Sequence, residues 1–124
     1  MSFTFFKLIH ILGILMVFLG LGGRAVLALQ PEPRKAPGQT LVGVLHGAGL
    51  MVVLLGGFGM LAKLGLTGEE LQGLGWLLVK MIVWIVLGGS IMIPVRRPQW
   101  TTHWLVAVTA LALVAGYFAF YKPF

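Results

Sequence analysis

Three histidines and one lysine lie inside, or at the rims of, apolar runs long enough to cross a bilayer: His10, His46, Lys80 and His103. Titratable side chains at membrane depth are energetically costly, so each one is a hypothesis about function. Neutral imidazoles are ligands for iron and copper, and an amine can neutralise an anionic group. These residue types predict cofactor or metal chemistry that uses neither cysteine nor a carboxylate inside the membrane.

The composition sets the class of protein. The chain has 124 residues, 59% of them hydrophobic, and a mean hydropathy of +1.01, which predicts one membrane domain. The absence of cysteine excludes disulfides, thiolate zinc sites, iron–sulfur clusters and covalently attached haem. The formal charge of +6 is scattered at the ends of the apolar runs, which favours orientation in a membrane over nucleic-acid binding.

Four apolar runs predict transmembrane helices over about residues 5–29, 40–63, 74–95 and 101–121. The runs do not alternate, so helices are favoured over barrel strands. The first run is too long for a signal peptide and has no cleavage site, so we expect it to be retained. A proline-rich loop at 30–38, a turn at 66–70 and a connector at 96–99 join the helices. Short loops favour an all-α, up-down four-transmembrane-helix bundle.

Basic residues predict the orientation of the helices. Arg24, Arg34, Lys35, Arg96 and Arg97 flank the first and third connections, and fewer basic residues flank the other side (Lys7, Lys63, Lys122). The positive-inside rule then places both termini in the periplasm of a bacterial cytoplasmic membrane.

Depth along the predicted helices sorts the polar residues into two layers. His10 and Lys80 lie roughly 8–9 Å below the outer surface, and His46, His103 and Arg24 lie near the inner surface. Two imidazoles on one iron have nitrogens about 4 Å apart, which His46 and His103 can satisfy. His10 and His46 differ by about 13 Å in depth, so we expect them not to share an iron within one subunit.

Helix faces favour an interior role for some of these residues. His10 and Arg24 return to nearly the same face of the first helix, together with Gly13, Ile14, Val17 and Leu21. His103, Ala107, Ala110 and Val114 form a small-residue face that suits a macrocycle or a partner helix. Helix packing accounts for most of the eighteen glycines, and it makes a homodimer plausible.

Each cationic or imidazole side chain has an alternative, purely structural role. Arg24 would bind a propionate, or extend to the headgroups as a topology anchor. Lys80 lies between Trp76 and Trp84 at helical spacing, where it would pair with an anion or extend to the surface. His103, next to Trp104, suits iron ligation and an interfacial position equally. Ligation is favoured for His10 and His46.

Short motifs resemble those of small four-helix bacterial membrane proteins of the SirB, CopD and HemJ types. They comprise Lys7-Leu-Ile-His10, Gly20 with Arg24, His46, Trp76-Leu-Leu-Val-Lys80, Leu87-Gly88 and the ending Tyr121-Lys122-Pro123-Phe124. The resemblance to HemJ implies a b-haem bundle in which His10 and Lys80 matter most, and the resemblance to CopD implies copper handling. Arg96-Arg97-Pro98 replaces an asparagine- and arginine-rich stretch of HemJ, which argues against porphyrinogen oxidation but not against haem.

Four functions follow from these residues. The first is a b-type haem protein that carries electrons between a membrane donor and a membrane or periplasmic partner. The second is a HemJ-like porphyrinogen-oxidising enzyme. The third is copper handling, in which Met51, Met60, Met81 and Met92 would join the histidines. The fourth is a scaffold subunit whose histidines only contact neighbouring helices.

Overall fold

The computed structural model describes residues 2–63, 65 and 75–121, without the side chain of Trp76. The predicted turn at 66–70, Lys122 and the last residues of the C-terminal motif lie outside this described part. The described residues are helical with no strand, so the predicted all-α class is confirmed. Four helices are long and apolar enough to cross a membrane: Phe3–Ala28, Gln39–Lys63, Leu77–Arg96 and Pro98–Tyr121. By length and composition the chain is a multi-pass membrane protein.

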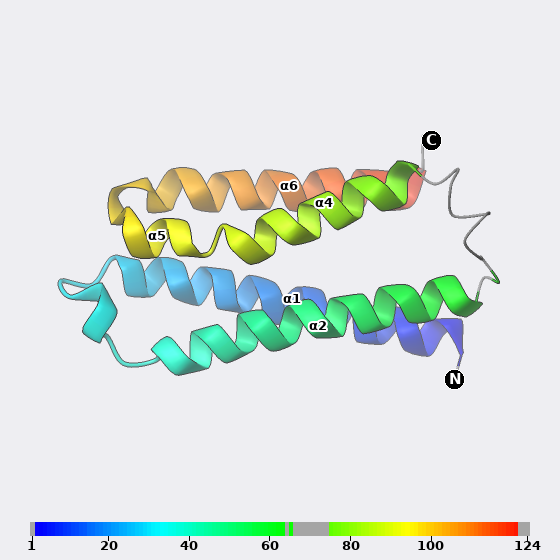
Figure 1. The fold of residues 1–124 in the computed structure, drawn as a ribbon, viewed down its shortest axis with the longest axis horizontal. Helices are drawn as coiled ribbons and strands as arrows, with labels where there is room; N and C mark the ends of the chain where they lie inside the picture. The colour runs from blue at the N-terminus through cyan, green and yellow to red at the C-terminus, as the bar shows by residue number, and fades with distance from the viewer. Residues whose placement is uncertain (1, 64, 66–74, 122–124) are drawn as a thin grey trace. The chain divides into compact units, whose positions relative to one another are not determined.

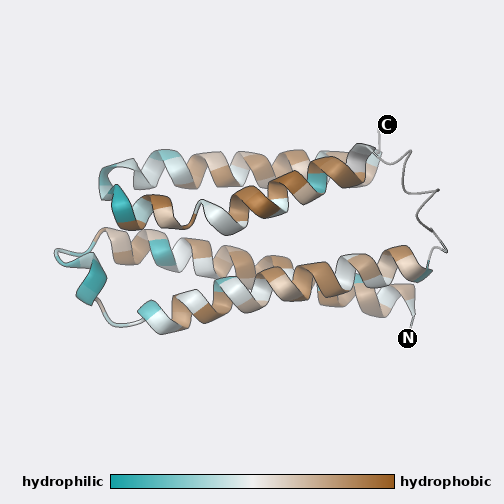
Figure 2. Ribbon diagram, viewed as in Figure 1, coloured by the Kyte–Doolittle hydropathy of each residue, from teal (hydrophilic) through white to brown (hydrophobic). Residues whose placement is uncertain are grey.

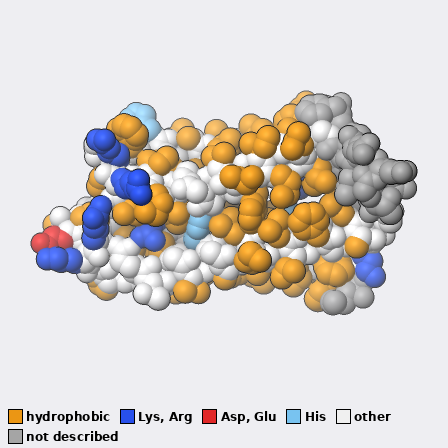
Figure 3. All heavy atoms as spheres, viewed as in Figure 1, with side chains coloured by type: hydrophobic (Ala, Val, Ile, Leu, Met, Phe, Trp, Pro, Cys, Tyr) orange, Lys and Arg blue, Asp and Glu red, His pale blue; other side chains and the backbone are white. Residues whose placement is uncertain are grey.

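Large apolar side chains lie exposed along all four helices, and Figure 3 shows many of them on one face of the molecule. Figure 2 shows that hydrophobic residues run along each helix. Leu19, Leu55 and Leu113 are 63%, 64% and 72% exposed. A water-soluble chain rarely exposes contiguous apolar surface of this extent, whereas lipid solvates it. The exposed sides of these helices therefore suit an apolar environment, and burial marks the sides that pack within the protein.

The chain forms two compact units, Met1–Thr67 and Gly68–Phe124, and each is described by itself. Unit 1 consists of α1 (Phe3–Ala28), the short 3-10 helix η1 (Pro33–Lys35) and α2 (Gln39–Lys63). Helices α1 and α2 lie side by side and antiparallel (Figure 1). Ser2 caps α1, because its hydroxyl accepts a hydrogen bond from the Phe5 amide at 3.1 Å. Gly38, with a φ of +99°, allows the turn into α2.

Unit 2 consists of α4 (Gly75–Gly89), α5 (Met92–Arg96), the 3-10 helix η2 (Pro98–Trp100) and α6 (Thr101–Tyr121). The third predicted helix is therefore interrupted between Gly89 and Met92. Pro94 has no amide hydrogen, and the Ser90 carbonyl accepts from the Ile93 amide at 2.9 Å instead. On α6, the Trp104 indole donates to the Ser90 hydroxyl at 3.1 Å, which ties α6 to the interruption.

Candidate functional site

Glycines set the close approach of α1 and α2. A Cβ built on Gly20 would lie 2.9 Å from the backbone nitrogen of His46, and one on Gly49 would lie 2.7 Å from that of Val17. One on Gly13 would lie 2.5 Å from the backbone nitrogen of Val53. Side chains at these positions would force the two backbones apart, as expected where small residues mediate helix packing in membranes. The sequence-based preference for helix packing is confirmed at these glycines.

His10 lies in this contact between α1 and α2. Its backbone faces Gly56, and its ring lies over Gly57, where an added Cβ would be 3.5 Å from both Nδ1 and Cε1. The ring nitrogen Nδ1 is 2.9 Å from the carbonyl oxygen of Val53. A carbonyl oxygen only accepts hydrogen bonds, so Nδ1 must carry the proton. In the neutral ring the lone pair is then on Nε2, the nitrogen that can bind a metal.

His46 is buried, with 5% of its surface exposed, and its backbone lies against Gly20 of α1. Beside it on the same helix, Gly43 and Gly47 are exposed, and a Cβ added to either would meet nothing within 4 Å, so the space next to these two positions is open surface. Because Gly20 contacts His46, it marks the level of His46 on α1, and it lies ten residues beyond His10. The two histidines are therefore about 15 Å apart along the helix axis. This agrees with the expectation that they do not share an iron within one subunit.

Arg24 lies one helical turn beyond Gly20, and so about 6 Å along the axis from the level of His46. Its Nη1 donates to the side-chain oxygen of Gln39, whose amide in turn donates to the carbonyl of Pro33. Its Nε is buried and has no hydrogen-bond partner among the described residues. A buried cationic donor of this kind is suited to an anionic oxygen from a bound group.

The predicted stripe on α1 is largely buried. Gly13, Val17 and Leu21 are buried as expected, but Ile14 is 39% exposed. Gly20, which the stripe did not include, is also buried. The packed side of α1 is thus centred on its glycines, slightly rotated from the predicted stripe.

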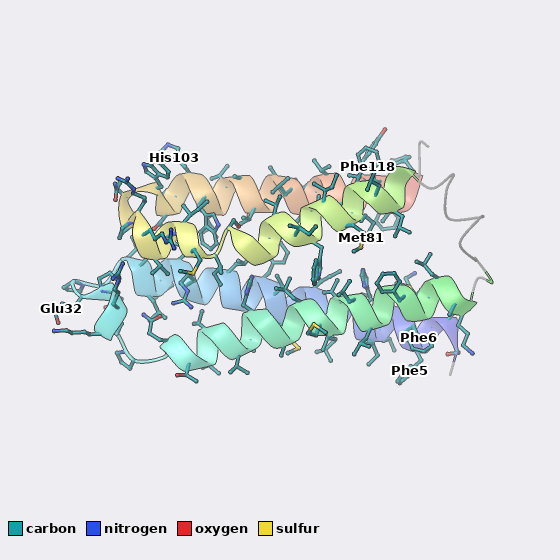
Figure 4. All side chains as sticks on the ribbon, viewed as in Figure 1. Phe5, Phe6, Glu32, Met81, His103 and Phe118 are labelled. Carbon is teal, nitrogen blue, oxygen red and sulfur yellow. The ribbon has the colours of Figure 1, made fainter. Side chains whose placement is uncertain are left out.

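His103 lies on a different side of α6 from the one that packs within unit 2. Thr101, Trp104 and Val108 are the buried residues of α6, whereas His103 is exposed and lies on the outer side of the helix (Figure 4). The predicted small-residue face that continues from it, Ala107, Ala110 and Val114, is exposed as well. Trp104 is buried within unit 2, and its indole is bonded to Ser90.

Lys80 is half-buried and lies in the middle of α4, four residues before the half-buried Trp84. The helical spacing of the predicted Trp76–Lys80–Trp84 ridge is present, because all three residues belong to α4. No group of three or more histidine, cysteine, aspartate or glutamate side chains that could hold a metal ion occurs among the described residues.

Helices α1 and α2 contain an internal sequence repeat that the sequence patterns described above did not include. His10, Gly13, Val17, Gly20 and Gly23 on α1 recur at identical spacing on α2 as His46, Gly49, Val53, Gly56 and Gly59. The signal was available in the sequence, as one pattern of histidine, valine and three glycines repeated thirty-six positions further along. It is hidden because the positions between these residues are uniformly apolar.

Comparisons with family models, with curated proteins and with solved structures find no match to the chain. The fold and the contacts around its polar residues therefore carry the functional argument.

Proposed function

We propose that this chain is a b-type haem-binding protein of the membrane that transfers electrons. The observation that carries the proposal is the hydrogen bond between His10 Nδ1 and the Val53 carbonyl. Histidines that bind metals are commonly oriented by such a bond on the other ring nitrogen. It directs the lone pair to Nε2 and orients the half-buried ring in the contact between α1 and α2.

The side chains of unit 1 fit the needs of a haem. His10 and His46 would provide axial imidazoles, and Arg24, with its buried Nε, would bind a propionate. The exposed surface at Gly43 and Gly47 leaves room for a flat group against the outside of α2, next to His46. Bound haem would supply one-electron chemistry at its iron, and the chain would tune the potential through its ligands and through burial.

A haem iron brings four porphyrin nitrogens and takes only one or two ligands from the protein. Bare copper or zinc instead depends on several protein ligands. The described residues offer no group of three such ligands, which favours haem over bare metal. Of the methionines considered for copper, Met51 and Met92 are 56% and 47% exposed. No contact favours the porphyrinogen-oxidising alternative, which stays a prediction from the resemblance to HemJ.

The proposal includes a location and partners. The protein would lie in a bacterial cytoplasmic membrane with both termini in the periplasm, as its basic residues indicate. It would receive an electron from a membrane donor and pass it to a membrane or periplasmic acceptor. Lys80 of α4 would pair with an anionic group, such as a lipid phosphate. The exposed His103 would lie near the headgroups rather than bind iron.

The test is the absorption spectrum of the full chain, purified in detergent after expression with ample haem, in oxidised and reduced forms. We expect a Soret band that His10→Ala and His46→Ala weaken and that the matched control His103→Ala leaves unchanged. A colourless wild-type protein would overturn the proposal. Iron and copper analysis of the same sample separates haem from copper, and complementation of a strain that lacks porphyrinogen oxidation tests the enzyme alternative.

A further inference from the structure

The contacts between α1 and α2 obey the internal repeat. Gly20 packs on His46 as Gly56 packs on His10, and Gly13 packs on Val53 as Gly49 packs on Val17. Gly23 packs on Val42 as Gly59 packs on Phe6. In each case, exchanging the two copies of the repeat converts one contact into the other. The two antiparallel helices are therefore related by an approximate two-fold axis that crosses them midway between the histidines.

This symmetry gives the two histidines equivalent backbone contacts, whereas the side chain of His46 is buried and that of His10 is half-buried. Each lies in a helix–helix contact, with its backbone against a glycine of the opposite helix. A basic residue also lies about one turn from the level of each histidine, although the repeat does not relate these two residues to each other. Lys7 precedes His10 by three residues, and Arg24 lies one turn beyond the level of His46. Both places thus combine an imidazole with a cation on the side of the nearer membrane surface.

The spacing of these two places is too large for a single iron. Their levels differ by about 15 Å along the helix axis. Two imidazole nitrogens on one iron are only about 4 Å apart. If both histidines bind iron, the helix pair must therefore hold two separate haems, one at the level of each histidine.

We propose that α1 and α2 hold two separate haem sites of the same kind, one at His10 and one at His46, one in each half of the membrane. This inference rests on the proposed haem function and adds the number of the haems and their arrangement. In each site the imidazole binds iron, and the nearby cation holds an anionic edge of the group toward the membrane surface.

The repeat does not extend to the basic residue of either site, because Lys7 has Gly43 as its counterpart, and this difference distinguishes the two sites. Arg24 has Met60 as its counterpart in the second copy. A fixed positive charge disfavours ferric iron, which carries one more positive charge than ferrous iron, so Arg24 raises the reduction potential of the nearer site. Replacing Arg24 by glutamine should lower the potential of the His46 site and leave that of the His10 site unchanged.

The experiment measures haem content and a potentiometric titration of absorbance on the full chain in detergent. The variants are His10→Gln, His46→Gln, the double variant and the matched control His103→Gln. Glutamine keeps an amide donor that can reach the Val53 carbonyl at position 10, but it is a poor iron ligand. We expect two redox components in wild type and in His103→Gln, one component with half the haem in each single variant, and none in the double variant.

Several results would overturn the two-site inference while leaving the proposed function in place. One is a single component in wild type, and another is complete loss of haem in one correctly folded single variant. A wild type without haem would overturn the proposed function as well. Incorrect folding of a histidine variant would show as a weaker helical circular dichroism signal or a changed elution volume in size-exclusion chromatography. In that case the Arg24→Gln variant distinguishes one haem site from two. A shift of one component supports two sites, and an equal shift of all the haem contradicts them.

Discussion

At the scale of single residues, polar side chains join segments that apolar packing alone would leave less well defined. Gln39 is the clearest case, because its amide links α1, η1 and α2. It accepts from Arg24 and donates to the Pro33 carbonyl. Both bonds are partly buried, so the loss of one partner leaves a partly buried polar group of the other without its described bond.

We predict that Gln39→Ala destabilises unit 1 by about 1–3 kcal/mol, because it leaves the Arg24 guanidinium without its described partner. The matched control is Gln30→Ala. Gln30 is exposed, and its amide makes a single 3.4 Å bond to the Val26 carbonyl, so its loss should change stability by less than about 0.5 kcal/mol. Unfolding of both variants by SDS in mixed micelles measures the difference. Equal effects would show that Gln39 does not join these segments.

A second residue-scale prediction concerns Ser90, whose hydroxyl accepts from the buried Trp104 indole. Ser90→Ala leaves that N–H without this acceptor and should destabilise unit 2 by about 1–3 kcal/mol. Thr109→Ala is the control, because the exposed Thr109 hydroxyl bonds only to the Leu105 carbonyl of its own helix. The near-ultraviolet circular dichroism of the tryptophans and SDS unfolding report the outcome. A Ser90→Ala protein as stable as the control would contradict the role given to this bond.

The candidate residues were found from the sequence because a charged or imidazole side chain is conspicuous in an apolar run. Their surroundings were only partly predictable. The level of His46 relative to His10 followed from helical rise, but the Val53 carbonyl that orients His10 belongs to a helix distant in sequence. His103 was placed on a predicted interior face because its neighbours Ala107 and Ala110 are small. In the structure the larger Trp104 and Val108 turn inward instead.

At the scale of elements, most helix bounds were predictable, and the packed side was largely predicted for α1 but not for α6. Length and proline positions placed α1, α2 and α6 to within a few residues. The interruption at Ser90 was missed, because Pro94 is surrounded by apolar residues that suit a continuous span. Polarity distinguishes inside from outside only when the solvent is water, so in these helices glycine spacing is the better guide to the packed side.

We predict that Gly56→Ala disrupts the packing of α1 on α2, because its new methyl group would collide with the backbone of His10. Overpacking of this kind costs about 1–3 kcal/mol. Gly47→Ala is the matched control, since its new methyl group would meet nothing within 4 Å. It should be neutral or stabilising by up to about 1 kcal/mol, because alanine favours helix over glycine. SDS unfolding compares the two, and a Gly56→Ala protein as stable as Gly47→Ala would refute the close contact.

At the scale of the whole molecule, the exposed apolar surface and the placement of charge together define how the chain meets its surroundings. The helices expose leucine and phenylalanine along their lengths, and the described lysines and arginines other than Lys80 lie at or near helix ends (Figure 3). The exposed Lys35 and Glu32 form a 3.9 Å ion pair at η1, which as a surface pair adds little stability. We therefore expect these charges to affect orientation more than folding.

The orientation is testable without background, because the chain has no cysteine of its own. Single cysteines at the exposed positions Ser2 and Gln99 report the N-terminal end and the connector next to Arg96 and Arg97. We predict that a membrane-impermeant maleimide labels Ser2→Cys on bacterial spheroplasts and labels Gln99→Cys only after permeabilisation. The physical reason is the excess of basic residues around the first and third connections, which keeps them in the cytoplasm. The reverse labelling pattern would show that the topology is inverted. Two lysines added after Ser2 provide a second test, because they favour a cytoplasmic N-terminus. In the predicted orientation they should weaken the labelling of Ser2→Cys, and in the inverted orientation they should leave it protected.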